Sequence, residues 1–233
     1  QRLSEHGLKP SAIDIILITH LHSDHIVDLY QLYISGWHSG RTKPFKLVGP
    51  RGIEKFFNRT MEAYDDELSL RIEWEKRPNK GGLEIEIIEI NEEFTFDDQD
   101  IKIKSIEVQH QPVEPAYGYE FLVKNKKVTY SGDTKYSKNL ENASKNAEYL
   151  IHEVFVDLNF DDKRMTQDTL KNVREYHSTP EDVGKLAQAA NVKNLVLNHF
   201  VPPVFDEELL KNEISKYYDG KIIVGSDLDV FNL

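Results

Sequence analysis

A short histidine-rich segment constrains this chain more than any other feature. The β-branched, apolar run Ile13–Thr19 predicts a buried strand, and the next six residues read HLHSDH. Alternation along an extended segment places His20 and His22 on the same side, and Asp24 and His25 lie on the turn that follows. Imidazole and carboxylate groups are ligands that zinc prefers. The segment therefore predicts a metal site at a strand end.

Composition limits the chemistry available around this segment. The 233 residues include no cysteine, so disulfides, cysteine-based metal sites and cysteine nucleophiles are excluded. The net charge of −11 disfavours a generic nucleic-acid binder, because phosphate contacts need a basic surface. No apolar run approaches the roughly 18 residues that span a bilayer, so no membrane partner is expected.

The order of predicted elements indicates one α/β domain over residues 1–233. Alternating residues predict antiparallel strands at 84–90 and 101–108, and a hairpin joins 119–123 to 127–130 around Asn125. Further strands are expected at 45–48, 149–154, 195–198 and 221–224, and helices at 51–64, 137–147, 179–190 and 206–218. Thr179-Pro180 is typical of a helix start. The pattern predicts sheets covered by helices.

Three further landmarks follow the histidine-rich segment in chain order. His110 follows an alternating strand in VQHQP, Asp133 follows a strand in YSGDT, and His199 ends a late strand in LVLNHF. With HLHSDH they resemble the signature of the metallo-β-lactamase superfamily over residues 19–200. The resemblance implies an α/β fold of the αββα sandwich type, with two mixed sheets covered by helices.

The resemblance also implies a dinuclear metal site. Seven side chains that can bind a metal at neutral pH match the ligand positions of the family: His20, His22 and His110 for one zinc ion, Asp24, His25 and His199 for the second, and Asp133 as the bridge between them. Two Zn²⁺ ions are therefore the expected cofactors, with Mn²⁺ or Fe as alternatives.

Other motifs resemble ribonuclease Z and its arylsulfatase-like relatives. They are SGDT, the segment from Pro112 to Tyr119, the pair His152-Glu153, and the HST segment that begins at His177. In that branch the HST histidine lies near the metal pair and contacts the scissile group. His177 is thus expected to donate a proton or stabilise charge, with Glu153 orienting it. Asp24, His177 and Glu153 are the expected catalytic residues.

The chain departs from ribonuclease Z in two respects. Asp133 follows His110 by only 23 positions, which leaves no room for the Gly/Pro-rich arm that grips tRNA in that family. Only 19 residues precede His20, so we expect that the first strands of one sheet are missing from the N-terminal end. For the same reason the cytoplasm is only slightly favoured as a location, and export stays open.

The leading hypothesis is a dinuclear zinc hydrolase in which a metal-bridging hydroxide attacks a phosphodiester or sulfate ester of modest size. The alternatives are a tRNA 3′-end endonuclease and a lactonase or β-lactamase-type hydrolase. A different class, a metal-binding protein with an inactive site, also stays open. The expected partner is a small-molecule ester rather than a nucleic acid, and the chain is expected to form a homodimer.

Overall fold

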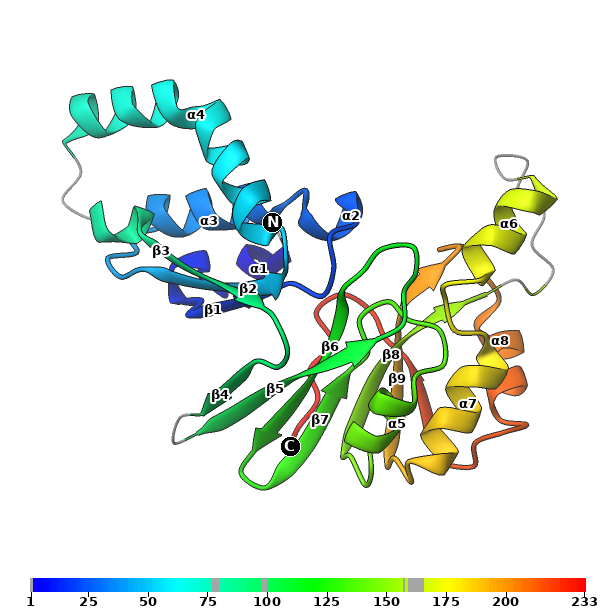
Figure 1. Ribbon diagram of the computed structural model, residues 1–233. Helices are drawn as coiled ribbons and strands as arrows, with labels where there is room; N and C mark the ends of the chain where they lie inside the picture. The colour runs from blue at the N-terminus through cyan, green and yellow to red at the C-terminus, as the bar shows by residue number, and fades with distance from the viewer. Residues whose placement is uncertain (1, 77–79, 98–99, 157, 159–165) are drawn as a thin grey trace. The chain divides into compact units, whose positions relative to one another are not determined.

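The computed structural model describes residues 2–76, 80–97, 100–156, 158 and 166–233 (Figure 1). The chain forms two compact units, residues 1–91 and residues 92–233, and each is built around a β-sheet of its own. We call them unit 1 and unit 2 and describe each by itself. Two sheets with helices confirm the predicted α/β class, whereas the single domain stays a prediction.

The sheet of unit 1 has the order β1-β2-β3, formed by Ile15–Leu17, Phe45–Pro50 and Ile85–Ile90. The prediction that residues 84–90 form an antiparallel strand is wrong, because β3 pairs parallel to β2, with Phe45 opposite Ile85. The connection explains the direction. Neighbouring parallel strands need a long crossover, and the helix α4 (Ile53–Glu75) provides it.

Helices cover this parallel sheet. Besides α4 they are α1 (Arg2–Glu5), α2 (Ser23–Ile26) and α3 (Leu29–His38), with short 3₁₀ turns at Pro10–Ala12 and Lys80–Leu83. The core contains the fully buried side chains of Trp37, Phe45 and Leu47. The histidine-rich segment follows β1, so the core of unit 1 positions it.

Arg41 ties the entry of β1 to the entry of β2. Its buried guanidinium donates hydrogen bonds to the backbone carbonyls of Ser11 (3.1 Å), Ile13 and Pro44 (2.6 Å). It also lies 3.9 Å from the centre of the Phe45 ring. Burial lowers the pKa of Arg41, and the three carbonyl dipoles compensate for the lost hydration of the charge.

The sheet of unit 2 is mixed and has the order β10-β9-β8-β7-β6-β5-β4. Its strands in chain order are Thr95–Asp97, Ile101–Val108, Ala116–Val123, Lys126–Tyr130, Tyr149–Phe155, Asn194–Val201 and Lys221–Val224. Pairings from β4 to β7 are antiparallel, and those from β7 to β10 are parallel. Parallel strands end at the same edge of a sheet, so side chains that follow β7, β8 and β9 lie close together.

The helices of unit 2 are α5 (Lys138–Ala143), α6 (Gln167–Arg174), α7 (Pro180–Ala189) and α8 (Glu207–Ile214). Figure 1 shows α5 and α7 beside the parallel half of the sheet, and side chains of α7 and α8 share a buried core with those of β8 and β9. The predicted start of α7 is confirmed by a capping box between Thr179 and Asp182. Among the described residues, no helix has the length and hydropathy required to cross a membrane.

Replacing Arg41 by methionine tests its anchoring role. Methionine keeps most of the apolar stem but leaves three carbonyls without their donor, so we expect the free energy of unfolding to fall by about 2–4 kcal/mol. Urea unfolding followed by circular dichroism measures the change. Lys43→Met is the matched control on the same loop, because Lys43 forms an exposed ion pair with Asp14 and its loss costs less than about 1 kcal/mol. Equal losses would contradict the anchoring role.

Candidate metal-binding active site

The two histidines that follow β1 point their rings at each other. His20 Nδ1 lies 3.0 Å from the hydroxyl of Thr19, and His20 Nε2 lies 3.0 Å from Nδ1 of His22. Two nitrogen ligands about 2.1 Å from one tetrahedral zinc ion lie roughly 3.4 Å apart. The spacing of these two nitrogens therefore fits a pair of ligands to a single ion.

Asp24 and His25 complete the group in unit 1. Both lie on the short helix α2, and Asp24 Oδ2 is 3.5 Å from Nε2 of His25. The His25 ring centre is 4.2 Å from that of His20. The side chain of Asp24 is 70% exposed, so its carboxylate is accessible to a metal ion. All four candidates of the segment are thus gathered at the end of one strand, as the sequence predicts.

In unit 2, Asp133 follows the end of a strand, as the histidine-rich segment does in unit 1. It follows β7 after Gly132, whose φ of 59° lets the chain turn. Asp133 Oδ2 lies 3.9 Å from Nε2 of His110, and Asp133 Oδ1 lies 3.5 Å from Nδ1 of His199. Each oxygen of the carboxylate thus faces a different imidazole, so Asp133 could bind a metal ion together with either histidine.

His110 is held in one ring orientation by the backbone. Its Nδ1 donates to the carbonyl of Tyr176 at 2.9 Å, which leaves Nε2 facing Asp133. Metal-binding histidines commonly use the second ring nitrogen in this way, because the bond fixes the tautomer and makes the free nitrogen a better ligand.

A β-bulge aims His199 toward the same group. In the pairing of β8 with β9, Glu153 lies opposite Asn198 and Val154 opposite Phe200, so His199 is the extra residue. Its φ of 43° is unusual for a residue with a side chain. Bulges often redirect a side chain next to an active site. Here the bulge brings an imidazole within reach of Asp133.

His177 lies beside these residues and is fixed by Glu153. Its Nδ1 donates to Glu153 Oε1 at 3.0 Å, and a ring nitrogen of His177 lies within 4.8 Å of the ligand atoms of Asp133 and His199. The same Oε1 accepts the backbone N–H groups of Thr134 and Ser178, each at 3.1 Å. The orientation of His177 by Glu153 that the resemblance implies is present in this geometry.

Burial shapes the electrostatics of β8. Burial, and next the negative charge of Asp133, raise the pKa of Glu153 well above its ordinary value, while the two backbone N–H donors oppose that shift. His152 is fully buried, and its Nδ1 lies 2.7 Å from the carbonyl of Glu153. Burial lowers the pKa of His152 to about 4, so it stays neutral and has a packing role.

The sequence did not predict several of the residues that hold the candidate site residues in place. The carbonyl of Tyr176 carries no signal in the sequence, because any residue offers a carbonyl. Thr134 and Ser178 lie inside the SGDT and HST motifs, and Ser178 Oγ also donates to the Thr134 carbonyl at 2.7 Å. Asn198 Nδ2 donates to the Tyr130 hydroxyl at 3.4 Å, and this contact lies next to the bulge at His199.

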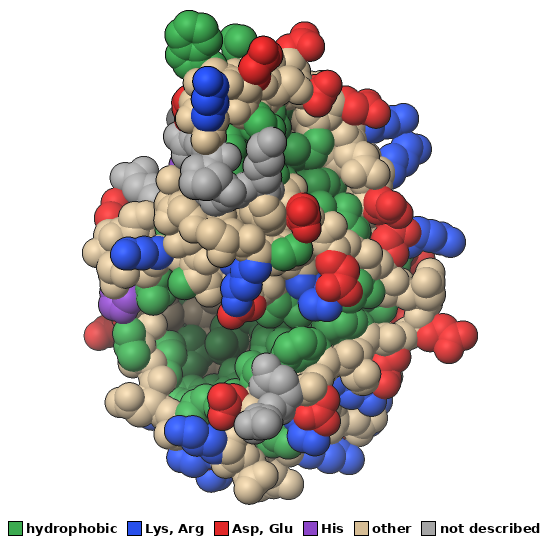
Figure 2. Space-filling view, turned by 90° about the vertical axis from the view of Figure 1, so that its left-hand side faces the viewer, with side chains coloured by type: hydrophobic (Ala, Val, Ile, Leu, Met, Phe, Trp, Pro, Cys, Tyr) green, Lys and Arg blue, Asp and Glu red, His purple; other side chains and the backbone are tan. Residues whose placement is uncertain are grey.

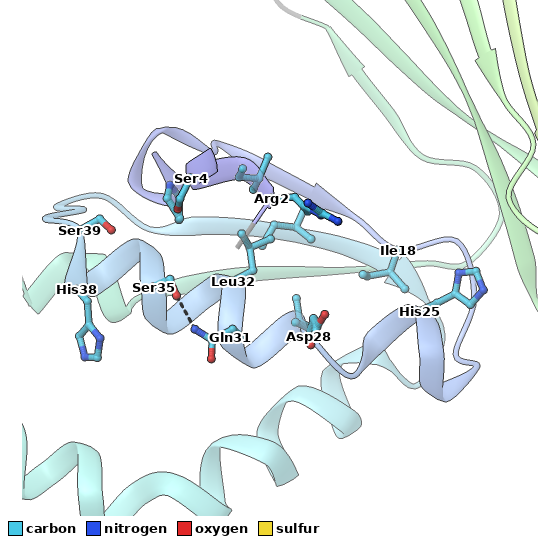
Figure 3. Close-up of a pocket in the computed structure, with 14 residues that line it drawn as sticks. Arg2, Ser4, Ile18, His25, Asp28, Gln31, Leu32, Ser35, His38 and Ser39 are labelled. Carbon is cyan, nitrogen blue, oxygen red and sulfur yellow. Dashed lines mark hydrogen bonds between the residues drawn. The ribbon is translucent and has the colours of Figure 1, made fainter. Parts of the chain in front are cut away.

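Unit 1 also contains a cavity that is lined mainly by residues other than the candidate metal ligands. Figure 3 shows this cavity, of about 960 Å³, with His25 at one end, His38 at the other, and α3 residues such as Gln31 between them. His25 is the sole candidate metal ligand among its lining residues. The cavity volume is therefore no guide to the position of the chemistry.

Comparison with known proteins identifies the class. Residues 1–200 match the Beta-lactamase superfamily domain, so the chain belongs to this family. Ribonuclease Z of Mycobacterium bovis (strain BCG / Pasteur 1173P2) is 27% identical over 234 residues, which cover 98% of this chain and 82% of the relative.

Solved structures support the same fold. The metallo-beta-lactamase fold protein YhfI from Bacillus subtilis has a TM-score of 0.69 at 20% identity, covering 97% of this chain and 80% of its own. Human tRNase Z, short form (ELAC1), has a TM-score of 0.68 at 22% identity, covering 99% and 83%. The predictions of a metallo-β-lactamase fold, of the ribonuclease Z branch and of a metal-dependent hydrolase are confirmed.

Asp133→Asn tests the bridging position. The amide has nearly the same shape but no charge, so we expect at least half of the bound metal and most of the activity to be lost. Metal content by mass spectrometry after dialysis is the measurement. Asp97→Asn is the matched control, because Asp97 is exposed and its partner among the described residues is the exposed Lys102. Normal metal content in Asp133→Asn would exclude a bridge at this position.

Proposed function

We propose that the chain hydrolyses phosphodiester bonds in RNA, as a ribonuclease Z-like enzyme. The observation that carries the proposal is the position of Asp133 between His110 and His199, with the Glu153–His177 pair alongside. The similarity to ribonuclease Z of Mycobacterium bovis supports RNA as the substrate class. This is the alternative of the sequence-based hypothesis, and the comparisons favour it over the smaller ester.

The cofactor in this proposal is a pair of zinc ions. The seven candidate ligands would hold them: His20, His22, Asp24 and His25 from unit 1, and His110, Asp133 and His199 from unit 2. When bound, the ions would supply an activated water and polarise the phosphoryl oxygen. The homodimer and the cellular location stay predictions.

His177 is the proposed general acid. Glu153 Oε1 accepts a hydrogen bond from the Nδ1–H of His177, which leaves Nε2 as the nitrogen that can hand a proton to the leaving oxygen. A carboxylate behind the ring stabilises the imidazolium form that carries this proton. The backbone N–H groups of Thr134 and Ser178 hold the carboxylate in place, so His177 is oriented before substrate binds.

A second candidate function is hydrolysis of a phosphodiester of modest size. The specific observation is the interval between His110 and Asp133, which β6, β7 and their turn occupy. The turn at Lys124 and Asn125 has φ values of 48° and 66°, as a tight hairpin requires. No tRNA-gripping arm fits in this interval. Figure 2 shows acidic and basic side chains interspersed on one face, in keeping with the net charge of −11.

The role of His177 can be tested with two leaving groups. We expect His177→Ala to retain its metal but to lose roughly 10²–10⁴ in turnover on a substrate with a poor leaving group, since the leaving oxygen needs a proton. The loss should shrink for p-nitrophenolate, which leaves without one. Steady-state kinetics and metal analysis measure both effects. An equal loss on both substrates would assign His177 to positioning or charge stabilisation instead.

A direct comparison of substrates tests the function itself. We expect the metal-loaded protein to cleave precursor tRNA at its 3′ end and also to hydrolyse bis(p-nitrophenyl) phosphate. Without an arm, cleavage of tRNA should fall steeply between low and physiological salt. Gel analysis of labelled RNA and release of p-nitrophenol are the readouts, with an aryl sulfate, a lactone and a β-lactam as further substrates. Cleavage of the small ester alone would establish the second candidate, and cleavage of neither would refute the proposal.

A further inference from the structure

A groove of about 600 Å³ lies in unit 1 beside the histidine-rich segment, and the proposed chemistry does not use it. Leu21 and Phe56 form its apolar part, and Lys55, Arg59 and Thr60 supply its polar part. We call it the α4 groove, because all of these residues except Leu21 lie on one face of α4.

The α4 groove begins next to candidate metal ligands of unit 1. Leu21 lies between His20 and His22 in the chain and lines one end of the groove. Gly52 lies against it, since a Cβ at this position would be 3.1 Å from Cδ1 of Leu21. The φ of 105° at Gly52 also requires glycine. A ligand in the groove would therefore extend from the histidine-rich segment along α4.

The charges on this face are unfavourable for the helix itself. Lys55 lies in the first turn of α4, where the helix dipole disfavours a cation, and Arg59 is a like charge four residues further along the helix. Within the described part of the chain, neither side chain makes an ion pair or hydrogen bond. At the other end of the same helix, Arg71 pairs with both Glu67 and Glu75. In a chain of net charge −11, two adjacent uncompensated cations point to an anionic ligand.

The apolar part of the groove indicates that the ligand also has an apolar or aromatic group. Phe56 is half-buried, packs against the core of unit 1 and lines the groove together with the two cations. Base–aromatic stacking combined with nearby cations is how proteins bind single-stranded nucleic acid. The Thr60 hydroxyl donates to the Phe56 carbonyl at 3.0 Å, which leaves its oxygen free to accept a hydrogen bond from a base or sugar.

We infer that the α4 groove binds a nucleotide of the RNA substrate next to the cleaved bond, with the base against Phe56 and a phosphate between Lys55 and Arg59. The inference rests on the proposed function, because it assigns a substrate subsite to the same enzyme. Its ligand is a short single-stranded end, and it needs only the residues of unit 1.

Binding of a short single-stranded RNA tests the groove. Phosphorothioate linkages keep the charge and resist hydrolysis, so fluorescence anisotropy can be measured on the full chain with its metal. We expect the double variant Lys55→Gln/Arg59→Gln to bind about tenfold more weakly or worse. The slope of log affinity against log salt should fall by about 0.7, since the variant removes one phosphate contact and each contact to a single strand contributes about 0.7.

The matched control removes two cations from the same unit elsewhere. Lys46→Gln/Arg71→Gln changes the net charge equally, but Lys46 pairs with Glu86 and Arg71 pairs with glutamates of its own helix. We expect this variant to keep the affinity of the unmodified chain. Phe56→Leu should bind several-fold more weakly with an unchanged salt slope, because it removes stacking and no charge. Urea unfolding midpoints establish that each variant is folded.

The outcomes separate the groove from the reaction. Equal losses in the two double variants, an unchanged affinity in Phe56→Leu, or no measurable RNA binding by the unmodified chain would overturn the inference. Cleavage of precursor tRNA by the unmodified chain tests the proposed function separately. If neither precursor tRNA nor bis(p-nitrophenyl) phosphate is cleaved while the groove variants still lose RNA binding, the proposed function fails and the groove stands. If precursor tRNA is cleaved while the groove variants bind RNA normally, the proposed function stands and the groove inference fails.

Discussion

One oxygen of the buried Glu153 carboxylate holds together the parts of unit 2 that carry the chemistry. Oε1 accepts hydrogen bonds from the Thr134 backbone, the Ser178 backbone and the His177 ring. The first fixes the turn that bears Asp133, and the other two fix the segment that bears His177. Burying a carboxylate is costly, and three donors on one oxygen offset part of that cost. The alignment of Asp133 with its neighbouring imidazoles thus depends on a residue that need not touch the substrate.

Short sequence patterns predicted the elements that are determined by residues close together in the chain. The hairpin of β6 and β7 follows from alternating residues around a turn that accepts positive φ, and the start of α7 follows from a capping box. The direction of β3 could not be read in this way, because an alternating strand looks the same whether its neighbour is parallel or antiparallel. The long helix α4 between β2 and β3 makes the parallel direction possible. The many charged residues in its second half gave no signal for its end at Glu75, and the sequence patterns did not predict α3.

The candidate site shows the same division. The residue types and their order identified all seven candidate ligands, and the structure groups those of each unit as the motifs imply. The sequence did not reveal the bulge at His199, because it arises from the pairing of β8 with β9, strands that are distant in the chain.

Net charge and local charge lead to different conclusions about the substrate. An overall charge of −11 weakens the attraction of a long polyanion, and the short interval between His110 and Asp133 leaves no arm to compensate. The α4 groove offers two cations and an aromatic side chain on one face of α4. In the function that we propose, affinity comes from the few nucleotides at the cleaved end rather than from the body of a folded RNA. The similarity to ribonuclease Z and the absence of an arm between His110 and Asp133 are then compatible, because the proposed reaction needs only that end of the RNA.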